Sequence, residues 1–236
     1  MNLFSTSSIR NYWERFPSSL RLIIKARLWT AIGTGAILYL SPIIFNSLGF
    51  SAEQIGIGIT TAACTGITTR FGTGYLLDKR YSYSKAIKVS CLIAIVSDFI
   101  LFYAQNYLTY LAGQFVLGAA TGIFWPSIEL AVALNCNNTI KSNEGYSLAR
   151  SADAIGVTLG VLVGTIGTYL EFTRIIYLTD FICMVYIFNS LKNKIKTIEK
   201  KENLKDTINT KSLSENRSNS STIKWFFDLS QLLSLT

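Results

Sequence analysis

Long apolar stretches alternate with short polar connections along most of this chain. A helix needs about 20 mainly apolar residues to cross the hydrocarbon core of a bilayer, and six stretches approach that length. We expect helices at residues 22–46, 54–77, 86–104, 108–133, 145–168 and 173–191. Packed as a water-soluble bundle, six such helices would leave almost nothing polar to face water. The pattern therefore predicts an all-α membrane protein with six transmembrane helices.

The composition agrees with a bilayer environment. Half of the residues are apolar and 15% are charged, whereas soluble proteins have about 25% charged residues. The net charge of +8 could indicate a nucleic-acid partner, but Lys and Arg gather in the tails and in alternate loops rather than on one face. The chain has no His, and its cysteines, at positions 64, 91, 136 and 183, form no CxxC pair. We therefore expect no nucleic-acid partner, no metal site, no cofactor and no disulfide.

The distribution of basic residues predicts the orientation in the membrane. Five bases lie at or before Arg27, four lie between positions 79 and 88, one is Lys141, and nine lie between 192 and 224. The intervening loops, 47–53, 105–107 and 169–172, contain none. Because cytoplasmic loops retain an excess of Lys and Arg, both termini are expected on the cytoplasmic side.

Polar segments flank the six predicted helices. Residues 1–21 read as a cytoplasmic segment, either a short helix on the lipid headgroups or an ordinary tail, and they lack the features of a signal peptide. Residues 192–222 are rich in Ser, Asn and Lys and predict a flexible cytoplasmic linker. Residues 223–236 read either as the start of an incomplete seventh helix or as an amphipathic stretch in the interface. The first reading makes the chain the first half of a longer arrangement.

The stretch GTGYLLDKR, residues 72–80, ends the second predicted helix. Gly72 and Gly74 leave bare backbone there, which allows another helix to approach closely. Asp78 lies four residues beyond Gly74, so it projects from the same helix face. Its carboxylate could accept from the N-terminal amides of a docked helix or pair with Lys79 or Arg80. A close helix crossing with a breakable charge contact is a plausible gate.

This stretch resembles the loop signature of the major facilitator superfamily, Gly-x-Leu-x-Asp-Arg-x-Gly-Arg-Lys. Gly74, Leu76, Asp78 and, conservatively, Lys79 match, whereas Tyr81 replaces the second Gly and Lys85 is what remains of the closing basic pair. Residues 112–128 and 144–164 resemble the fourth and fifth helices of that family. In the first, Gln114 stands where an Arg is common, and in the second, glycines at 156, 160 and 164 form a small-residue face.

The resemblance implies the amino-terminal half of a twelve-helix transporter, built as two three-helix inverted repeats. It also implies a substrate path between the halves, lined by the first and fourth helices. Thr34, Tyr39, Thr121 and Trp125 are candidates for lining it, although packing between helices is an equally good reading of such residues. The gating motif implied by the resemblance comprises Gly72, Gly74, Leu76, Asp78, Lys79, Arg80 and Lys85.

Ionisable residues inside the predicted spans need a partner or a function, because each costs about 2.5–3.5 kcal/mol on insertion scales. Arg27, Arg70, Glu129, Arg150 and Asp153 fall in the cytoplasmic half of their helices, and we expect them to form one coupled cluster. A structural ion-pair network is the preferred interpretation. The sharper hypothesis makes Glu129 or Asp153 a proton-coupling carboxylate.

Two further acidic residues, Asp98 and Asp180, lie in the outer half of the third and sixth predicted helices. We expect them to reach the outer interface or a neighbouring hydroxyl and assign them no role in transport.

No arrangement of nucleophile and base, metal ligands or phosphate-binding loop is present, so we expect no enzymatic activity. The leading hypothesis is an integral membrane transporter that moves small organic solutes by alternating access, in the form of proton-coupled export. Its expected partners are the lipid bilayer, a small-molecule substrate, and either the missing C-terminal six helices or a second copy of the chain. An inactive truncated remnant and a non-transporting binding or scaffold protein of the membrane are the alternatives.

Overall fold

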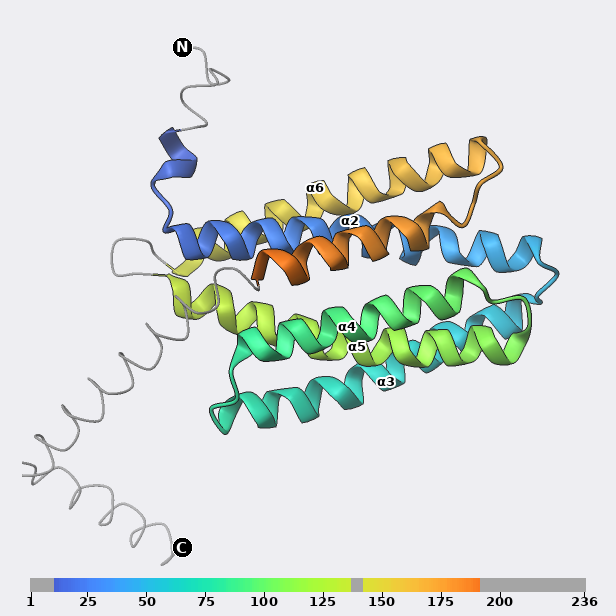
Figure 1. Cartoon of the computed structure of the whole chain (residues 1–236), viewed down its shortest axis with the longest axis horizontal. Coiled ribbons are helices and arrows are strands. Elements are labelled where there is room, and N and C mark those ends of the chain that lie inside the picture. The colour runs from blue at the N-terminus through green and yellow to red at the C-terminus, as the bar shows by residue number, and fades with distance from the viewer. Residues whose placement is uncertain (1–10, 137–141, 192–236) are drawn as a thin grey trace, which may run out of the picture. The chain divides into compact units, whose positions relative to one another are not determined.

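Six long helices run back and forth along one common direction (Figure 1). This computed structural model describes residues 11–136 and 142–191, all within one compact unit, Met1–Asn193. The helices are α2 (Ser18–Ser47), α3 (Ala52–Asp78), α4 (Tyr83–Phe102), α5 (Tyr107–Asn135), α6 (Ser142–Tyr169) and an unlabelled helix, Ile175–Leu191, drawn in orange. The described residues contain no strand, so the predicted all-α class is confirmed.

The helices α2, α4 and α6 begin at one end of the unit, where α3 and α5 end and toward which Ile175–Leu191 runs. We call this the Arg27 end. Each predicted range overlaps one helix, but the helices extend into polar turns that apolar runs do not reveal. For example, α2 begins directly after Pro17, four residues before the predicted start. The predicted linker, 192–222, the predicted incomplete helix, 223–236, and residues 1–10 lie outside the described residues.

Side-chain caps define the start of two helices at the opposite end. The Ser51 hydroxyl accepts from the Gln54 amide at 3.2 Å, while the Gln54 side chain accepts from the Ser51 amide at 3.0 Å, a capping box that begins α3. The Asn106 side chain accepts from the Thr109 amide at 2.9 Å and begins α5. These caps satisfy amides that the first helical turn leaves without partners.

Within the described residues, three helices are long and apolar enough to span a membrane: α2, α5 and, in α6, the stretch Asn143–Tyr169. The helix Ile175–Leu191 is apolar but shorter. Six threonines and five glycines lower the apolarity of α3, and α4 carries Lys85, Lys88 and Asp98. Of the six predicted spans, three therefore correspond to helices that are both long and apolar enough to cross a membrane.

The threonines of α3 satisfy their own hydroxyl groups. Thr65, Thr69 and Thr73 each donate to the carbonyl oxygen four residues earlier, at 2.7–2.8 Å. Because these hydrogen bonds lie within the helix, the hydroxyls need no water as a partner. The polar content of α3 is therefore compatible with an apolar surrounding.

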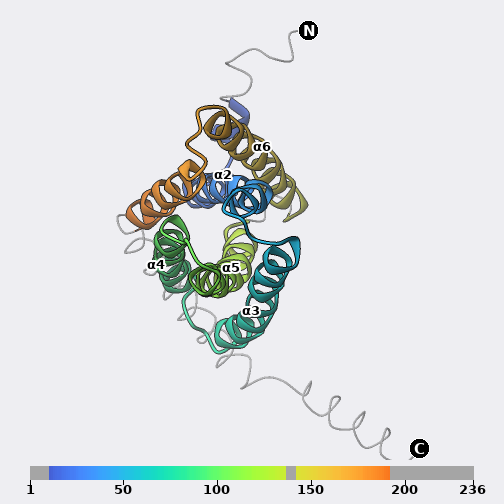
Figure 2. The same cartoon turned by 90° about the vertical axis from the view of Figure 1, so that its right-hand side faces the viewer.

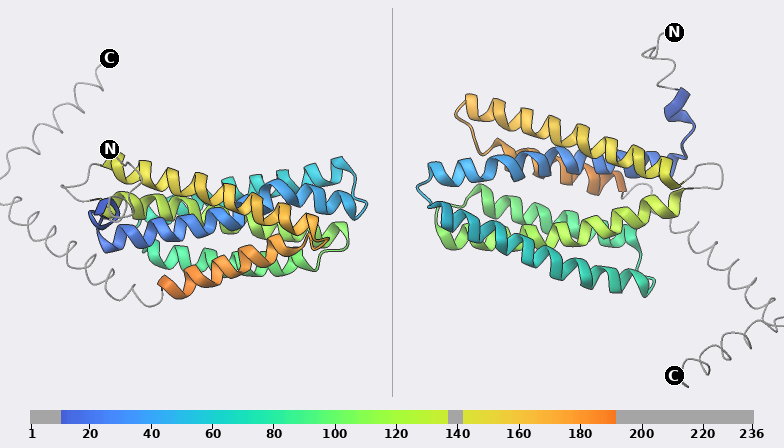
Figure 3. Two further views of the ribbon diagram at one scale, coloured as in Figure 1. Left: turned by 90° about the horizontal axis from the view of Figure 1, so that it is seen from above. Right: turned by 180° about the vertical axis from the view of Figure 1, so that it is seen from behind.

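Close helix crossings hold the unit together. Helix α2 packs mainly on α6, while α3 and α4 pack on α5, and the views in Figures 2 and 3 agree on these neighbours. At two crossings only a glycine fits: a methyl group added at Gly160 of α6 would overlap the Ile32 carbonyl of α2, and one at Gly118 of α5 would overlap the Ala62 carbonyl of α3. The predicted small-residue face of α6 is thus confirmed as a packing surface on α2.

The last helix connects the two groups of helices. The hydroxyl groups of Tyr177 and of Ser41 on α2 share a hydrogen bond of 2.9 Å, and the Tyr186 ring lies 5.0 Å from the Trp29 ring of α2. Just before this helix, Arg174 donates to the Phe102 carbonyl at the end of α4. Figure 2 shows the orange helix beside α4. The unit is therefore closed on this side by contacts to both α2 and α4.

Large apolar side chains cover the outside of the helices. Exposed members of this set are Leu38, Ile43, Ile57, Ile67, Phe71, Val96, Phe99, Phe115, Leu162, Ile166 and Ile182. Such a surface is unfavourable in water and suits lipid. The outer surface thus supports the membrane environment that the sequence predicts.

Replacing Gly160 with Ala is expected to destabilise the protein. The added methyl group would overlap the Ile32 carbonyl oxygen and lie 2.9 Å from the Ala36 amide nitrogen, and overpacking of this kind costs about 1–3 kcal/mol. Gly56 is the matched control, because nothing lies within 4 Å of a methyl group added there. Replacing Gly56 with Ala is expected to stabilise its helix by up to about 1 kcal/mol. Thermal unfolding in detergent compares the two, and equal unfolding temperatures would contradict this packing.

Candidate functional site

Four charged side chains from three helices meet near the Arg27 end of the unit. Arg27 of α2 donates from Nε to Asp153 Oδ1 at 2.7 Å, and from Nη2 to Asp153 Oδ2 and to Glu129 Oε1, both at 2.8 Å. Arg150 lies one helical turn before Asp153, with its Nη2 at 3.2 Å from Glu129 Oε1 and its Nη1 at 3.7 Å from Asp153 Oδ2. We call these four residues the charge cluster. With two guanidinium and two carboxylate groups, it is electrically neutral.

The two arginines of the charge cluster differ sharply in exposure. The Arg27 side chain is 0% exposed, and that of Arg150 is 68% exposed. Burying an unpaired charge is very costly. Arg27 can therefore be buried at this position only because it contacts both carboxylates. Its Nη1 has no acceptor among the described residues, but the Trp125 ring lies 5.2 Å from its Cζ, within the range of a cation–π contact.

Arg70, the fifth residue of the expected cluster, lies elsewhere. It is exposed on α3, and no ion pair with it is found within residues 11–136 and 142–191. The physical reason is the packing of the helices: α3 packs mainly on α5 and away from α2 and α6, which carry three of the other four charged residues. Arg70 itself is exposed on α3 and makes no ion pair with Glu129 of α5 among the described residues. Depth along the membrane normal alone does not bring residues on different helices into contact.

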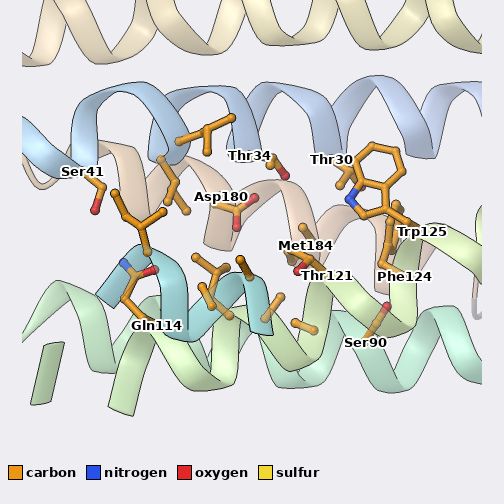
Figure 4. A pocket seen from close by; sticks show the side chains of 18 of the residues that line it. Thr30, Thr34, Ser41, Ser90, Gln114, Thr121, Phe124, Trp125, Asp180 and Met184 are labelled. Carbon is orange, nitrogen blue, oxygen red and sulfur yellow. The ribbon is translucent and has the colours of Figure 1, made fainter. Parts of the chain in front are cut away.

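A cavity of about 240 Å³ lies between α2 and α5 (Figure 4). Its walls are completed by α3, α4 and the helix Ile175–Leu191. Most of its lining is apolar. The polar or aromatic lining residues are Thr30, Thr34, Ser41, Ser90, Gln114, Thr121, Phe124, Trp125 and Asp180. The cavity thus combines an apolar wall with a few hydroxyl, amide and carboxyl groups, as ligand sites commonly do.

Three of the four residues expected in a substrate path line this cavity: Thr34, Thr121 and Trp125. Tyr39 does not line it and is 57% exposed. Five residues along a helix turn the side chain by about 140°, so Tyr39 faces away from the surface that carries Thr34. Ser41, Gln114 and Asp180 are lining residues that were not expected in this role, and the helical spacing of Ser41 from Thr34 was a signal that could have identified it.

Trp125 connects the cavity with the charge cluster. Its ring lines the cavity and also faces the guanidinium group of Arg27. Glu129, one helical turn further along α5, pairs with the same guanidinium group. A change in the charge cluster would therefore act directly on one end wall of the cavity.

The loop after α3 ends the helix without a glycine. The Tyr81 amide donates to the Leu76 carbonyl at 3.1 Å and the Arg80 amide to the Leu77 carbonyl at 3.0 Å, which is the Schellman pattern. Arg80 has a φ of 67°, in the left-handed region that glycine normally occupies. The ammonium group of Lys79 lies 4.4 Å from the Tyr75 ring. Of the other residues of the expected gating motif, Asp78 and Lys85 are exposed.

The glycines of the expected gating motif contact no other helix of this unit. Nothing lies within 4 Å of a methyl group added at Gly72 or Gly74. Neighbouring Phe71 is 78% exposed, and Leu76 is exposed as well. No ion pair of Asp78 with Lys79 or Arg80 is present in the part of the chain that the structure describes. Because residues two apart lie about 200° apart around a helix, this end of α3 is open on two sides, in contrast to the filled crossings of α5 and α6.

The expectation that Asp98 and Asp180 reach the outer interface or a neighbouring hydroxyl is wrong. Each residue is only 2% exposed, and the two carboxyl groups are close enough to interact electrostatically with each other. The nearby Ser97 hydroxyl donates instead to the Gly113 carbonyl at 3.0 Å. The sequence places both residues in the outer half of their helices but does not show that these helices, α4 and Ile175–Leu191, face each other.

No group of three or more His, Cys, Asp or Glu residues that could hold a metal ion is found in the described residues. The candidate functional site has three parts: the charge cluster, the cavity and the buried carboxyl pair of Asp98 and Asp180.

The family model described as Major Facilitator Superfamily matches residues 26–229, well over half of the chain. No curated protein matches the chain significantly.

Replacing Arg27 with Met is expected to destabilise the unit by about 3–5 kcal/mol, because Glu129 and Asp153 would lose their buried partner. Arg150→Met is the matched control: Arg150 contacts the same two carboxylates from an exposed position, and such pairs contribute at most about 1 kcal/mol. Unfolding in detergent measures both losses.

Neutralising the carboxylates as well, with Glu129→Gln and Asp153→Asn in the Arg27→Met background, is expected to recover part of the loss. Equal losses for Arg27→Met and Arg150→Met would contradict the central position of Arg27.

Proposed function

Because the chain belongs to the major facilitator superfamily, a family of membrane transporters rather than enzymes, we propose that it transports small organic molecules by alternating access, as proton-coupled export. The observation that carries this proposal is the cavity between α2 and α5, whose end wall at Trp125 touches the buried charge cluster. A cavity whose end wall rests on a buried ion-pair network provides one fixed half of a substrate site, and alternating access moves such a half against a second body.

The cavity wall favours a largely apolar substrate. Hydroxyl and amide groups such as those of Thr34, Thr121 and Gln114 are spread among aliphatic and aromatic neighbours, and no basic residue lines the cavity. The volume of about 240 Å³ lies below the usual 300–1,000 Å³ of ligand sites. A neutral or weakly polar organic molecule fits this cavity wall best. Part of that molecule would also contact a second group of helices outside this unit.

The second body is either a further set of six helices or a second copy of this chain. The open end of α3 at Gly72 and Gly74 supports this view, because small residues in membranes serve close helix packing and no described residue lies within 4 Å of a methyl group added at either glycine. We assign the gating role to this end together with Leu76, Asp78, Lys79, Arg80 and Lys85. The Asp78 carboxylate, exposed at the helix end, is free to accept from a docked helix terminus.

The charge cluster serves a structural role in this proposal. Arg27 already holds both Glu129 and Asp153, so neither carboxylate is free to bind a proton without breaking an ion pair. A coupling proton is better held by a carboxylate that has no arginine partner. The basic residues before α2 and after α3 support an orientation with the Arg27 end in the cytoplasm.

Filling the cavity tests transport. Cells that produce the protein are expected to accumulate less of an uncharged aromatic fluorescent dye than control cells, and a proton uncoupler is expected to remove the difference. Thr34→Trp is expected to reduce this efflux by at least about tenfold, since loss of a binding contact of 1.4 kcal/mol already gives that factor. Thr158→Trp, on the exposed side of α6, is the control of equal size. Dye efflux that is unchanged by Thr34→Trp at equal membrane abundance would contradict the cavity as the path.

Replacing Gly74 with Leu tests the open end of α3. Nothing in the unit opposes the added side chain, so the unfolding temperature in detergent is expected to stay the same, while efflux in cells is lost because a partner can no longer approach. Gly56→Leu, also unopposed on α3, is the control that should retain efflux. Efflux equal to that of the unmodified protein in the Gly74→Leu variant would contradict a docking role for this end.

A further inference from the structure

We propose that Asp98 and Asp180 form a proton-binding pair inside the membrane, in which one carboxyl group carries a proton and donates it in a hydrogen bond to the other carboxylate. This inference rests on the proposed function for its role in coupling, but the site itself is defined by the geometry of the unit.

The two carboxyl groups are buried together without a donor. Both oxygens of Asp98 and the Oδ1 of Asp180 are buried and have no hydrogen-bond partner among the described residues. The hydroxyl groups nearby are engaged elsewhere: Ser97 donates to the Gly113 carbonyl, and Tyr177 and Ser41 bond to each other. Three of the four carboxylate oxygens therefore lack a hydrogen-bond partner within the part of the chain that the structure describes.

No cation among the described residues of the unit forms an ion pair with Asp98 or Asp180. The titratable neighbours are Cys91 on α4 and Tyr177 and Cys183 on the last helix. Helix α2 contributes the backbone of Gly33. The last charged residue along α2 is Arg27, and the charged residue of α5 is Glu129, so both helices carry their charges toward the Arg27 end. The nearest base, Arg174, donates to backbone carbonyls at the end of α4.

Two adjacent carboxylates in a low-dielectric surrounding cannot both be ionised. Binding one proton removes one charge, forms one O–H bond and supplies the missing donor in a single step. The proton comes from water, and the remaining negative charge is shared through a short charge-assisted hydrogen bond. A single proton thus gives a hydrogen-bond partner to two of the three buried oxygens that lack one among the described residues.

The donor set favours a proton over a metal ion. The pair supplies two carboxyl groups, and the nearby hydroxyl groups of Ser97, Tyr177 and Ser41 are already engaged in hydrogen bonds. The nearby thiols of Cys91 and Cys183 are soft ligands unsuited to Na⁺, Mg²⁺ or Ca²⁺. Hard cations need six or more oxygen ligands in the case of Ca²⁺ and near-ideal octahedral geometry in the case of Mg²⁺. The proton requires only the two facing oxygens.

Asp180 connects the pair to the cavity. It is one of the residues that line the cavity, and Figure 4 shows its carboxyl group among the lining side chains, between those of Thr34 and Met184. The bare backbone of Gly33 makes room for it, since a methyl group added at Gly33 would overlap Asp180 Oδ1. A buried carboxyl group without a partner is thus placed where a proton from the cavity can reach it.

The sequence around the two residues is alike. Ser97-Asp98-Phe99-Ile100 on α4 and Thr179-Asp180-Phe181-Ile182 on the last helix share the pattern Ser/Thr-Asp-Phe-Ile. The two helices run in opposite directions. A two-fold axis in the membrane plane, as in inverted repeats, would bring these two positions face to face. The likeness supports a paired function for the two carboxyl groups over a chance contact.

Infrared spectroscopy of the purified full chain in lipid measures the proton directly. The unmodified protein at neutral pH is expected to show the carbonyl stretching band of a protonated carboxyl group, equivalent to one group per chain. The double variant Asp98→Asn/Asp180→Asn is expected to lose this band, and Glu53→Gln, at an exposed position of α3, is expected to keep it. A neutral-pH spectrum without this band, or an equal band in the double variant, would overturn the proposal.

Thermal unfolding provides a second readout. The pair retains its proton in the folded state, whereas ordinary exposed carboxyl groups in the unfolded chain have lost theirs at neutral pH, so stability is expected to fall as the pH rises. In Asp98→Asn/Asp180→Asn this dependence is expected to vanish between mildly acidic and mildly basic pH. An unchanged dependence in that variant would also contradict the proposal. Neither the infrared measurement nor the unfolding measurement needs a substrate. They therefore test the proton-binding pair independently of dye efflux, which tests the proposed transport.

Discussion

The buried guanidinium group of Arg27 is the interaction on which the rest of the structure depends. An arginine that water cannot reach is tolerated only with charged partners in good geometry, and Asp153 and Glu129 supply them at 2.7–2.8 Å. Because these partners lie on α6 and α5, one side chain of α2 determines how three helices are rotated toward one another. The same rotation turns Thr30, Thr34 and Ser41 of α2 toward α5 and so creates the polar part of the cavity wall.

The glycines of this unit serve two different kinds of surface. At Gly160 and Gly118 the backbone of a neighbouring helix fills the space that a side chain would take, and these crossings belong to the interior of the unit. At Gly72 and Gly74 the same residue type faces open space, beside exposed Phe71. In a membrane, where lipid offers no hydrophobic driving force between helices, close packing of small residues is a main source of association. Under the proposed function, a partner docks at this open end of α3, and the filled crossings hold the helices of the unit together.

The sequence predicted much of the fold because its strongest signals are local. Apolar runs show the helices, and the approximate depth of Arg27, Glu129, Arg150 and Asp153 follows from counting residues along helices of alternating direction. Arg70 has a similar depth but lies apart, because depth does not reveal which helices are neighbours. Tyr39 was chosen for its chemistry rather than for its helix face and therefore points away from the cavity. The pairing of Asp98 with Asp180 depends on the contact between α4 and the last helix, and the shared Ser/Thr-Asp-Phe-Ile pattern was the one local hint of it.

Hydrogen–deuterium exchange, followed by mass spectrometry on the protein in lipid nanodiscs, tests the central position of Arg27 most directly. In the unmodified protein, backbone amides of α2, α5 and α6 around the charge cluster are expected to exchange slowly. The account predicts that Arg27→Met raises exchange in all three helices together and leaves α3 and α4 unchanged, because Arg27 joins only the first three. Faster exchange confined to α2, with α5 and α6 as protected as before, would contradict it.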